Sequence, residues 1–252
     1  CADAPLNEDL LRIGTAHYFL GGIRIDQSAR TTVPGLFAAG EVTGGLFGAA
    51  RLGGTAMADT IVFGAIAGAE AAREATNCPT PGLDNKHIRR EGEALRAMLS
   101  PQGRPAGELT THLRNLMWRN CGTMRDRASI ERTLSNLGDL PASTSAIRAE
   151  DSLGLREGVE YRNMLVVAQL LAEATLVREE TRGCFWRMDF PEPDTLNGLR
   201  NTFQWQSKGL PHCETRPAVM SRFTTPTPPQ IGAGCFDYLP TVPPLSPEPL
   251  NR

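Results

Sequence analysis

The sequence has no long apolar run and no excess of either charge. Its best candidate for a membrane span, residues 61–69, is nine residues long, whereas a spanning helix needs about 20. Within that run, the spacing of Gly64 and Gly68 indicates close packing in a core rather than a membrane dimer. Lysine and arginine number 26 against 28 acidic residues, which gives a formal net charge of −2. We therefore expect neither membrane insertion nor nucleic-acid binding.

Closely spaced cysteines are also absent. The six cysteines stand singly, and none lies in a CxxC pair or near a histidine at a metal-ligand spacing: Cys1, Cys78, Cys121, Cys184, Cys213 and Cys235. This pattern excludes the usual zinc and iron–sulfur motifs. Scattered cysteines in a chain of this length are typical of reduced thiols, which predicts a cytoplasmic protein.

Two classes of catalytic motif are missing as well. No GxGxxG fingerprint occurs, so the chain carries no dinucleotide pyrophosphate cradle of its own. No Ser-His-Asp order favours hydrolysis, and Pro191 between Asp189 and Glu192 predicts a turn rather than a pair of carboxylates on one face. The first residue is Cys1 instead of Met, and residues 1–16 read as the middle of a segment. We therefore expect a fragment, or one piece of a split protein.

The residues that are present suit a globular chain. Hydrophobic residues make up 40% of the 252 positions, enough for one or two domains with cores. The run Pro-Thr-Pro-Gly at 79–82 predicts a linker between a first domain, 1–78, and a second domain, 79–223. Prolines crowd residues 224–252, which predicts an extended tail without a regular core.

The first domain has an α/β pattern. Residues 22–26 alternate apolar and polar side chains, as a half-buried strand does, and residues 36–39 are apolar throughout, as a strand covered on both faces is. Glu41 follows the second of these runs, at the sheet edge where ligands bind in open α/β sheets. Residues 55–75 favour a helix.

The second domain has a helical pattern. Apolar residues recur with a 3.6-residue period in four segments, which predicts a bundle of three or four antiparallel helices. The last helix is expected over 155–182, with Gly183 just after its end, and residues 203–205 and 218–220 are expected to pair as a small β-hairpin. The predicted buried stripes are Ile88, Leu95 and Leu99; Leu109, Leu113, Leu116 and Asn120; Ile130, Leu134 and Leu137; and Leu155, Val159, Val166, Leu170, Ala174 and Val177.

Three side chains of the first domain are candidates for chemistry. Arg51 follows the glycine-rich loop 44–48 and could bind a carboxylate with two parallel hydrogen bonds, or it could be a surface arginine. His17 could donate to a substrate carboxylate or carry protons, or it could be a structural residue beside aromatics. Glu41 could accept hydrogen bonds from a ribose, or it could cap the following turn.

These motifs, taken together, resemble a known family. The runs His-Tyr-Phe-Leu-Gly-Gly at 17–22, Gly-Leu-Phe-Ala-Ala-Gly-Glu-Val-Thr-Gly-Gly at 35–45 and Arg-Leu-Gly-Gly at 51–54 are similar to the succinate dehydrogenase/fumarate reductase flavoprotein family, which includes L-aspartate oxidase. The segment 180–191 resembles the Arg-Gly and Asp-Phe-Pro signature of the helical C-terminal domain of that family. The resemblance covers residues 13–222.

The resemblance implies a fold, a cofactor and partners. The fold would be an α/β remnant of an FAD-binding domain followed by an α-helical bundle domain, with a small β-hairpin and an extended proline-rich tail. FAD would be shared with an N-terminal FAD-binding segment or subunit, and an iron–sulfur electron-transfer subunit is a further candidate partner. The matching cofactor-binding positions are Gly22, Glu41, Ala56 and Met57, and those for a carboxylate-bearing substrate are His17 and Arg51.

The sequence also departs from the family pattern. Phe47 and Ala50 stand where the family has a histidine and an asparagine, which makes the pocket more apolar and leaves room for an unsaturated or amino acid other than succinate or fumarate. The segment with the proton-shuttling arginine would lie before Cys1, so no catalytic acid is assigned. We expect an FAD-dependent oxidoreductase that transfers hydride, inactive as this chain alone. The alternative is a non-catalytic interaction module that retains a relic flavin motif.

Overall fold

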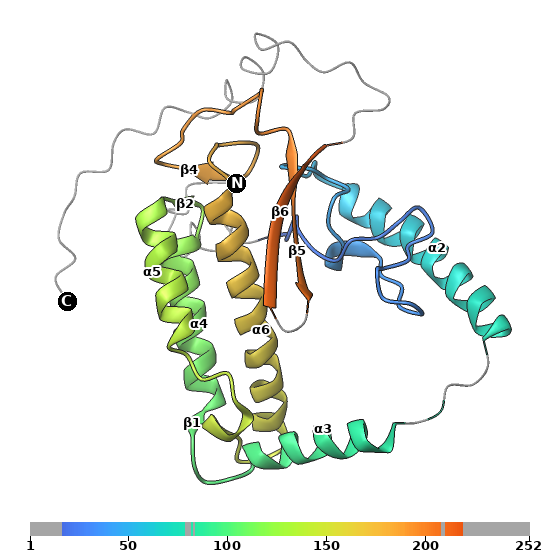
Figure 1. The fold of residues 1–252 in the computed structure, drawn as a ribbon, viewed down its shortest axis with the longest axis vertical. Helices are drawn as coiled ribbons and strands as arrows, with labels where there is room; N and C mark the ends of the chain where they lie inside the picture. The colour runs from blue at the N-terminus through green and yellow to red at the C-terminus, as the bar shows by residue number, and fades with distance from the viewer. Residues whose placement is uncertain (1–16, 79–81, 83, 208–209, 219–252) are drawn as a thin grey trace, which may run out of the picture.

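A computed structural model of the chain describes residues 17–78, 82, 84–207 and 210–218. The α-helices are α2 (Thr55–Asn77), α3 (Asn85–Met98), α4 (Ala106–Cys121), α5 (Arg127–Gly138) and α6 (Ser152–Val177). Three helices, α4, α5 and α6, pack side by side as a bundle, α2 stands apart from them, α3 extends from one end of the bundle, and a β-hairpin lies against it (Figure 1). Most of the predicted linker and the whole predicted tail lie outside the described residues.

The bundle is formed by α4, α5 and α6, which pack around one apolar core. Leu109 and Leu113 of α4 and Ile130 of α5 are buried, as their 3.6-residue spacing predicts. The start of α5 is fixed by a capping box, in which the Asp126 carboxylate accepts a bond from the backbone N–H of Ser129 and the Ser129 hydroxyl oxygen accepts one from the backbone N–H of Asp126. The prediction of helices in this region is therefore confirmed.

The predicted buried stripe on α6 is wrong at three of its six members, whereas Leu155 packs against the core. Three of its members, Val166, Leu170 and Val177, are 58%, 40% and 44% exposed. The buried side of α6 carries Gly158, Tyr161, Leu165, Ala168, Ala172 and Thr175. Because this helix is apolar on more than one side, its periodicity does not determine which side faces the core.

The end of α6 also differs from the prediction. The helix ends at Val177 rather than at Arg182, because Arg178 adopts an extended backbone conformation with ψ 107°. The Arg178 guanidinium pairs with the Glu180 carboxylate and donates to the carbonyl of Gly198 at 3.0 Å. These bonds hold the segment after α6 as an irregular loop.

Helix α3 begins at a side-chain cap and touches the bundle only at its end. The Asp84 carboxylate accepts bonds from the backbone N–H groups of the first turn. Met98 is the buried residue of α3, and its thioether packs against Gly158 of α6. The predicted buried stripe of α3 is wrong, since its members are exposed: Ile88, Leu95 and Leu99.

The first part of the chain does not contain the two predicted strands. Residues 22–26 form one isolated bridge, between Ile23 and Thr43, and residues 36–39 form another, between Arg30 and Phe37. A strand needs neighbouring strands for its backbone groups and an apolar cover for its side chains. The described residues supply neither for these segments, and both predicted strands are wrong here. The short helix η1 (Gly40–Val42) and α2 are the regular elements.

The predicted hairpin is present, with a shifted second strand. Strand β5 (Arg200–Ser207) pairs antiparallel with β6 (Leu210–Pro217), so the paired strand ends before residue 218, and residues 219–220 of the predicted strand lie outside the described residues. The Gln204 amide donates to the Glu173 carboxylate at 3.2 Å, which ties the hairpin to α6. Two short parallel pairs connect the ends of the bundle helices: β1 (Arg104–Pro105) with β3 (Ile147–Arg148), next to η2 (Thr144–Ala146), and β2 (Met124–Arg125) with β4 (Trp186–Arg187).

The turn at Gly183 joins the segment after α6 to the first part of the chain. The backbone N–H of Cys184 donates to the carbonyl of Ala49 at 2.9 Å. Gly183 has φ +58°, and a Cβ at this position would overlap the Ala49 carbonyl and lie 3.0 Å from the Ala50 side chain. Only glycine fits this backbone conformation and this close approach without strain.

The segment after α6 is anchored by a fully buried arginine. The Arg187 guanidinium pairs with both oxygens of Asp189, at 2.8 and 2.7 Å, and also donates to the carbonyls of Thr175 and Arg178. The hydrogen bonds from Arg187, together with one from the backbone N–H of Arg127, lower the pKa of Asp189 to about 2.

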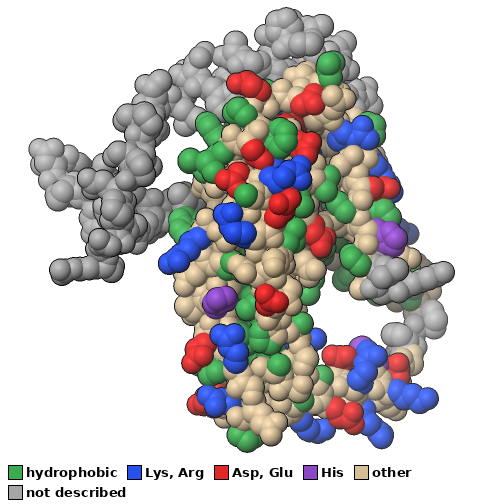
Figure 2. Space-filling view, turned by 60° about the vertical axis from the view of Figure 1, so that its left-hand side comes forward, with side chains coloured by type: hydrophobic (Ala, Val, Ile, Leu, Met, Phe, Trp, Pro, Cys, Tyr) green, Lys and Arg blue, Asp and Glu red, His purple; other side chains and the backbone are tan. Residues whose placement is uncertain are grey.

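The surface carries charges of both signs. Acidic and basic side chains are interspersed over the face of the molecule seen in Figure 2. Among the residues that the structure describes, no helix is long and apolar enough to cross a membrane, and no group of histidine, cysteine and acidic side chains could hold a metal ion. Cys78, Cys121, Cys184 and Cys213 are free thiols.

The pairing of Asp189 with Arg187 should make stability depend on acid pH. Because the pKa of Asp189 falls from 3.8 to about 2 on folding, its contribution is present above about pH 4 and is lost as the pH approaches 2, by about 1–2 kcal/mol. Asp189→Asn should remove this dependence and cost about 3 kcal/mol at neutral pH, since Arg187 then stays buried without its counter-charge. Urea unfolding of this chain at several pH values measures both effects. Asp139→Asn, at the exposed end of α5, is the control and should leave the pH dependence unchanged.

Gly183→Ala should weaken the contact between the turn and the 49–50 backbone. The added methyl group meets the Ala49 carbonyl and forces a left-handed conformation on a residue with Cβ, which together should cost about 2 kcal/mol. Gly138→Ala at the end of α5 is the matched control, because its Cβ would meet no atom within 4 Å. Equal free energies of unfolding for the two variants would show that this contact does not stabilise the chain.

Candidate functional site

The candidate site begins where η1 meets the segment from His17 to Gly22. The Glu41 carboxylate accepts a hydrogen bond from the backbone N–H of Phe19 at 2.8 Å. The Thr43 hydroxyl donates to the Gly40 carbonyl at 2.8 Å and closes the turn behind Glu41. One oxygen of Glu41 thus fixes the 17–22 backbone, and the other makes no hydrogen bond within the described part of the chain.

Gly22 lies where two backbone segments cross. A Cβ at Gly22 would overlap the carbonyl of Val42, and one at Gly44 would lie 2.8 Å from the backbone nitrogen of Gly22. The backbone N–H of Ile23 donates to the Val42 carbonyl at 2.8 Å across the same crossing. The two glycines therefore permit an approach that places η1 beside the 17–22 segment.

Arg51 lies on the aromatic ring of Tyr18. The centre of its guanidinium is 4.3 Å from the centre of the ring, and Phe47 packs against the same ring at 5.8 Å in an edge-to-face arrangement. Arg51 also donates from Nη1 to the carbonyl of Leu52 at 3.2 Å, while its Nε is buried without a hydrogen-bond partner among the described residues. Glu41 and Arg51 therefore contact neighbouring residues, Phe19 and Tyr18.

Tyr18 is the centre of this group of charges. Burial raises the pKa of its hydroxyl, and the negative charges of Asp59 and Glu41 raise it further, while Arg51 acts in the opposite direction. The hydroxyl is therefore protonated at neutral pH and available as a hydrogen-bond donor. The charges of Glu41, Arg51 and Asp59 thus all act on the Tyr18 hydroxyl, and Arg51 also contacts the ring.

Sequence reasoning missed Asp59. This residue is 7% exposed, it is the buried residue of α2, and both carboxylate oxygens are buried without a hydrogen-bond partner in the described part of the chain. The signal was an acidic residue in the second turn of an apolar helix, between Met57 and Ile61. A carboxylate in that position is usually solvated, so the sequence alone does not mark it.

The start of α2 leaves backbone donors open. Gly54 precedes the helix with φ +84° and provides no side-chain cap, and the first turn contains no acidic residue. Ala56 is half-buried and Met57 is 70% exposed. The free N–H groups and the positive end of the helix dipole favour an anion or an electron-rich group at this position.

His17 is not brought into contact with the other candidates. It is the first described residue, and its side chain is exposed. Arg51 contacts Tyr18, the residue that follows His17 in the chain. Among the described residues, His17 and Arg51 make no direct bond with each other.

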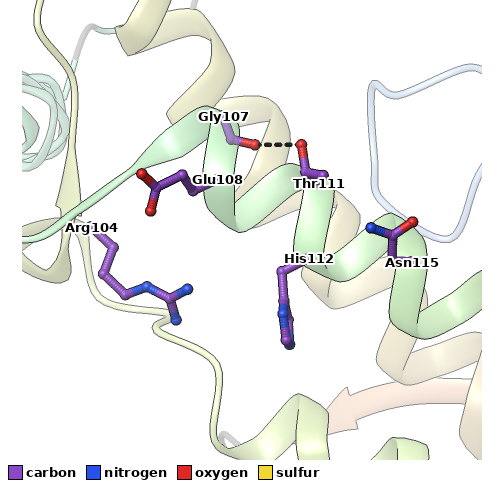
Figure 3. Close-up of a pocket in the computed structure, with 6 residues that line it drawn as sticks. All are labelled: Arg104, Gly107, Glu108, Thr111, His112 and Asn115. Carbon is purple, nitrogen blue, oxygen red and sulfur yellow. Dashed lines mark hydrogen bonds between the residues drawn. The ribbon is translucent and has the colours of Figure 1, made fainter. Parts of the chain in front are cut away.

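A depression on α4 is a separate feature of the surface. It has a volume of ≈ 490 Å³ and is lined by exposed residues of mixed polarity: Arg104, Gly107, Glu108, Thr111, His112 and Asn115 (Figure 3). The Thr111 hydroxyl donates to the Gly107 carbonyl at 2.9 Å, as a threonine on a helix commonly does. Sequence reasoning assigned none of these residues a role, and the depression shares none with the group around Tyr18.

Two family models match the chain, one in its first part and the other in its helical second part. Residues 4–57 match an FAD binding domain, and residues 110–231 match the fumarate reductase flavoprotein C-term. The first match ends at the start of α2, and the second spans the bundle and the hairpin.

Individual proteins give the same result. The chain is 30% identical to the fumarate reductase flavoprotein subunit of Haemophilus influenzae over 86% of its own length and 38% of that protein. It is 33% identical to L-aspartate oxidase of Streptomyces coelicolor over 78% of its own length and 34% of that protein. Its fold matches Sdh1 of Mycobacterium smegmatis, solved in complex with UQ1, with a TM-score of 0.72 and 29% identity over 81% of this chain and 36% of that one.

The chain thus spans about a third of the length of the curated relatives it matches. The matches cover both the glycine-rich motifs of the first part and the helical second part. The chain belongs to the succinate dehydrogenase/fumarate reductase flavoprotein family.

Proposed function

We propose that this chain is part of an FAD-dependent oxidoreductase of the succinate dehydrogenase/fumarate reductase type. It completes a flavin and substrate site together with an N-terminal FAD-binding segment that this sequence does not include. The observation that carries the proposal is that Glu41 and Arg51 contact the adjacent residues Phe19 and Tyr18. The match of residues 4–57 to an FAD binding domain supports it.

The residues present fit a flavin. The close crossing at Gly22, the Glu41 oxygen that accepts no bond from the described residues and the uncapped start of α2 at Ala56 and Met57 form a backbone-rich surface with open donors and an acceptor. Gly22, Glu41, Ala56 and Met57 would hold FAD, which when bound would supply the hydride-transfer chemistry. The N-terminus of α2 would stabilise negative charge at that position.

The substrate is proposed to carry a carboxylate. Arg51 would bind it, because a guanidinium holds a carboxylate with two parallel bonds, and His17 would donate a further bond. Phe47 packs on Tyr18 and gives this side of the site an aromatic wall. An aromatic wall does not distinguish among a dicarboxylate, an amino acid and another unsaturated acid as the substrate.

The arrangement of the whole enzyme is part of the proposal. We divide the chain at residue 78, directly after α2, into a part of the FAD-binding domain (1–78) and a helical domain (79–223), with the tail 224–252 beyond. The proposed partners are the N-terminal FAD-binding segment and an iron–sulfur electron-transfer subunit, in the cytoplasm.

One observation favours the alternative, a non-catalytic module with a relic flavin motif. Arg51 already donates from Nη1 to the Leu52 carbonyl, and Phe47 and Ala50 add no polar partner for a substrate. In that case the helical region and the proline-rich tail would dock to a redox partner, and the glycine-rich motif would have no catalytic role.

Measuring turnover distinguishes an active enzyme from a non-catalytic module with a relic flavin motif. In the enzyme assembled from this chain and its N-terminal FAD-binding segment, Arg51→Gln should lower kcat/KM for a carboxylate substrate about 100-fold, because the group that orients the carboxylate is lost. Fumarate reduction and aspartate oxidation are the two assays. Arg90→Gln, on an exposed side chain of α3, is the control. Unchanged turnover in Arg51→Gln at full FAD content would favour the relic.

Alone, this chain should bind FAD weakly or not at all, since it has no pyrophosphate cradle. Fluorescence titration of FAD with the purified chain measures this. Adding the N-terminal FAD-binding segment should restore binding, which Glu41→Gln should weaken and Glu150→Gln, on the exposed turn before α6, should not. Tight stoichiometric binding by this chain alone would contradict the proposal of a shared site.

A further inference from the structure

The segment after α6 contains a closed turn, residues 182–185, that the proposed flavin and substrate contacts leave without a role. The backbone N–H of Arg182 donates to the Phe185 carbonyl at 2.9 Å, and the N–H of Phe185 donates back to the Arg182 carbonyl at 3.0 Å. A glycine with positive φ as the first of the two central residues suits such a turn, and Gly183 has φ +58°. The two reciprocal bonds make the turn a small rigid element.

A buried carboxylate holds this turn to the rest of the molecule. Glu180 is 2% exposed. Its oxygens accept bonds from Nε of Arg182 at 3.0 and 3.2 Å, from Nη2 of Arg182 at 2.9 Å, and from the backbone N–H of Asp194 at 2.9 Å. A planar guanidinium that binds a buried carboxylate through two of its nitrogens has little freedom to rotate. Glu180 therefore fixes the residue with which the turn begins.

The turn in its fixed place holds the backbone that leads to Arg51. The N–H of Cys184 donates to the Ala49 carbonyl at 2.9 Å. Gly183 approaches Ala49 so closely that a Cβ would overlap the same carbonyl. The turn thus holds the peptide that joins Ala49 to Ala50, directly before Arg51.

The loop before Arg51 has few other restraints. Gly45 and Gly48 both have positive φ, and a Cβ at either position would meet no atom within 4 Å. Among the described residues, the bond from Cys184 is the one backbone hydrogen bond that joins residues 45–50 to another segment. A glycine-rich loop loses much conformational entropy when it becomes ordered. Unless another element orders the loop in advance, that loss would weaken the binding of any ligand to Arg51.

We propose that the 182–185 turn is a positioning element of the substrate site, which fixes the Ala49 carbonyl and thereby orients the guanidinium of Arg51. Arg182 is the positioning residue, since it connects the turn to the buried Glu180. In this arrangement the helical domain sets substrate affinity without touching the substrate. The assignment of Arg51 to a substrate carboxylate rests on the proposed function, whereas the link from the turn to Arg51 does not.

The link is tested first on this chain alone, without cofactor or substrate. NMR measures the hydrogen exchange of the Cys184 amide and, with labelled arginine, the ring-current shift that Tyr18 imposes on the Arg51 side chain. Gly183→Ala should raise the exchange rate about tenfold and reduce the Arg51 shift, because the added methyl group forces the turn away from the loop. Gly138→Ala should change neither signal. If the Arg51 shift is unaltered in a folded Gly183→Ala chain, the link is wrong.

Arg182→Gln is a milder variant, and Arg178→Gln is its matched control. Both arginines pair with the Glu180 carboxylate, but Arg178 connects it to the Gly198 carbonyl instead of to the turn. Arg182→Gln should therefore reduce the Arg51 shift, whereas Arg178→Gln should leave it unchanged. Equal effects in the two variants, including none in either, would overturn positioning by the turn.

The assembled enzyme tests the consequence for the substrate. At full FAD content, Arg182→Gln should raise KM for a carboxylate substrate about fivefold and change kcat less, since the group that holds the carboxylate is present but less well oriented. In an Arg51→Gln background the same substitution should have no further effect on KM, because the turn acts through Arg51. An additive rise in KM would mean that the turn acts by another route, which overturns the proposal.

Two outcomes distinguish a failure of this proposal from a failure of the proposed function. If Arg182→Gln changes the Arg51 shift but Arg51→Gln leaves kcat/KM unaltered, the proposed function is wrong and the link from the turn to Arg51 stands. If Arg51→Gln lowers kcat/KM but Arg182→Gln leaves KM unaltered, Arg51 binds the substrate and the turn does not position it.

Discussion

The backbone contact between Cys184 and Ala49 is the constraint on which the rest of the site depends. It attaches the segment after α6 to the glycine-rich loop, and that loop leads directly into Arg51. The turn at Gly183 is fixed in position because the buried Arg187, a few residues later, donates hydrogen bonds to backbone carbonyls at the end of α6. The position of Arg51 is therefore set from the bundle on one side and from the Tyr18 ring on the other.

The sequence predicts helices well where one side of a helix is clearly apolar. The stripes on α4 and α5 fall in the core because polar residues occupy the other sides of those helices. On α6, Val166 and Leu170 are as apolar as the buried Leu165 and Ala168, so the pattern does not choose between sides. On α3, the periodic residues are exposed because only the Met98 end reaches the bundle.

Strands and charged groups are harder to predict for a different reason. The patterns at 22–26 and 36–39 are typical of strands, but a strand forms only with partners, and the described residues give each segment a single bridge. Glu41 and Arg51 were found because they stand in a recognisable motif. Asp59 was missed because its burial depends on contacts of α2 with η1, which are distant in sequence.

The stacking of Arg51 on Tyr18 does not by itself argue against a catalytic role. A cation–π contact uses the face of the guanidinium, whereas a carboxylate binds the N–H groups at its edge. The two interactions are compatible, and the ring restricts the rotations that Arg51 would otherwise lose on binding a substrate. An arginine with its plane fixed and its edge directed by neighbouring groups is better prepared for a carboxylate than a solvated one. The aromatic wall of Tyr18 and Phe47 is thus consistent with an orienting scaffold, even though it lacks polar groups of its own.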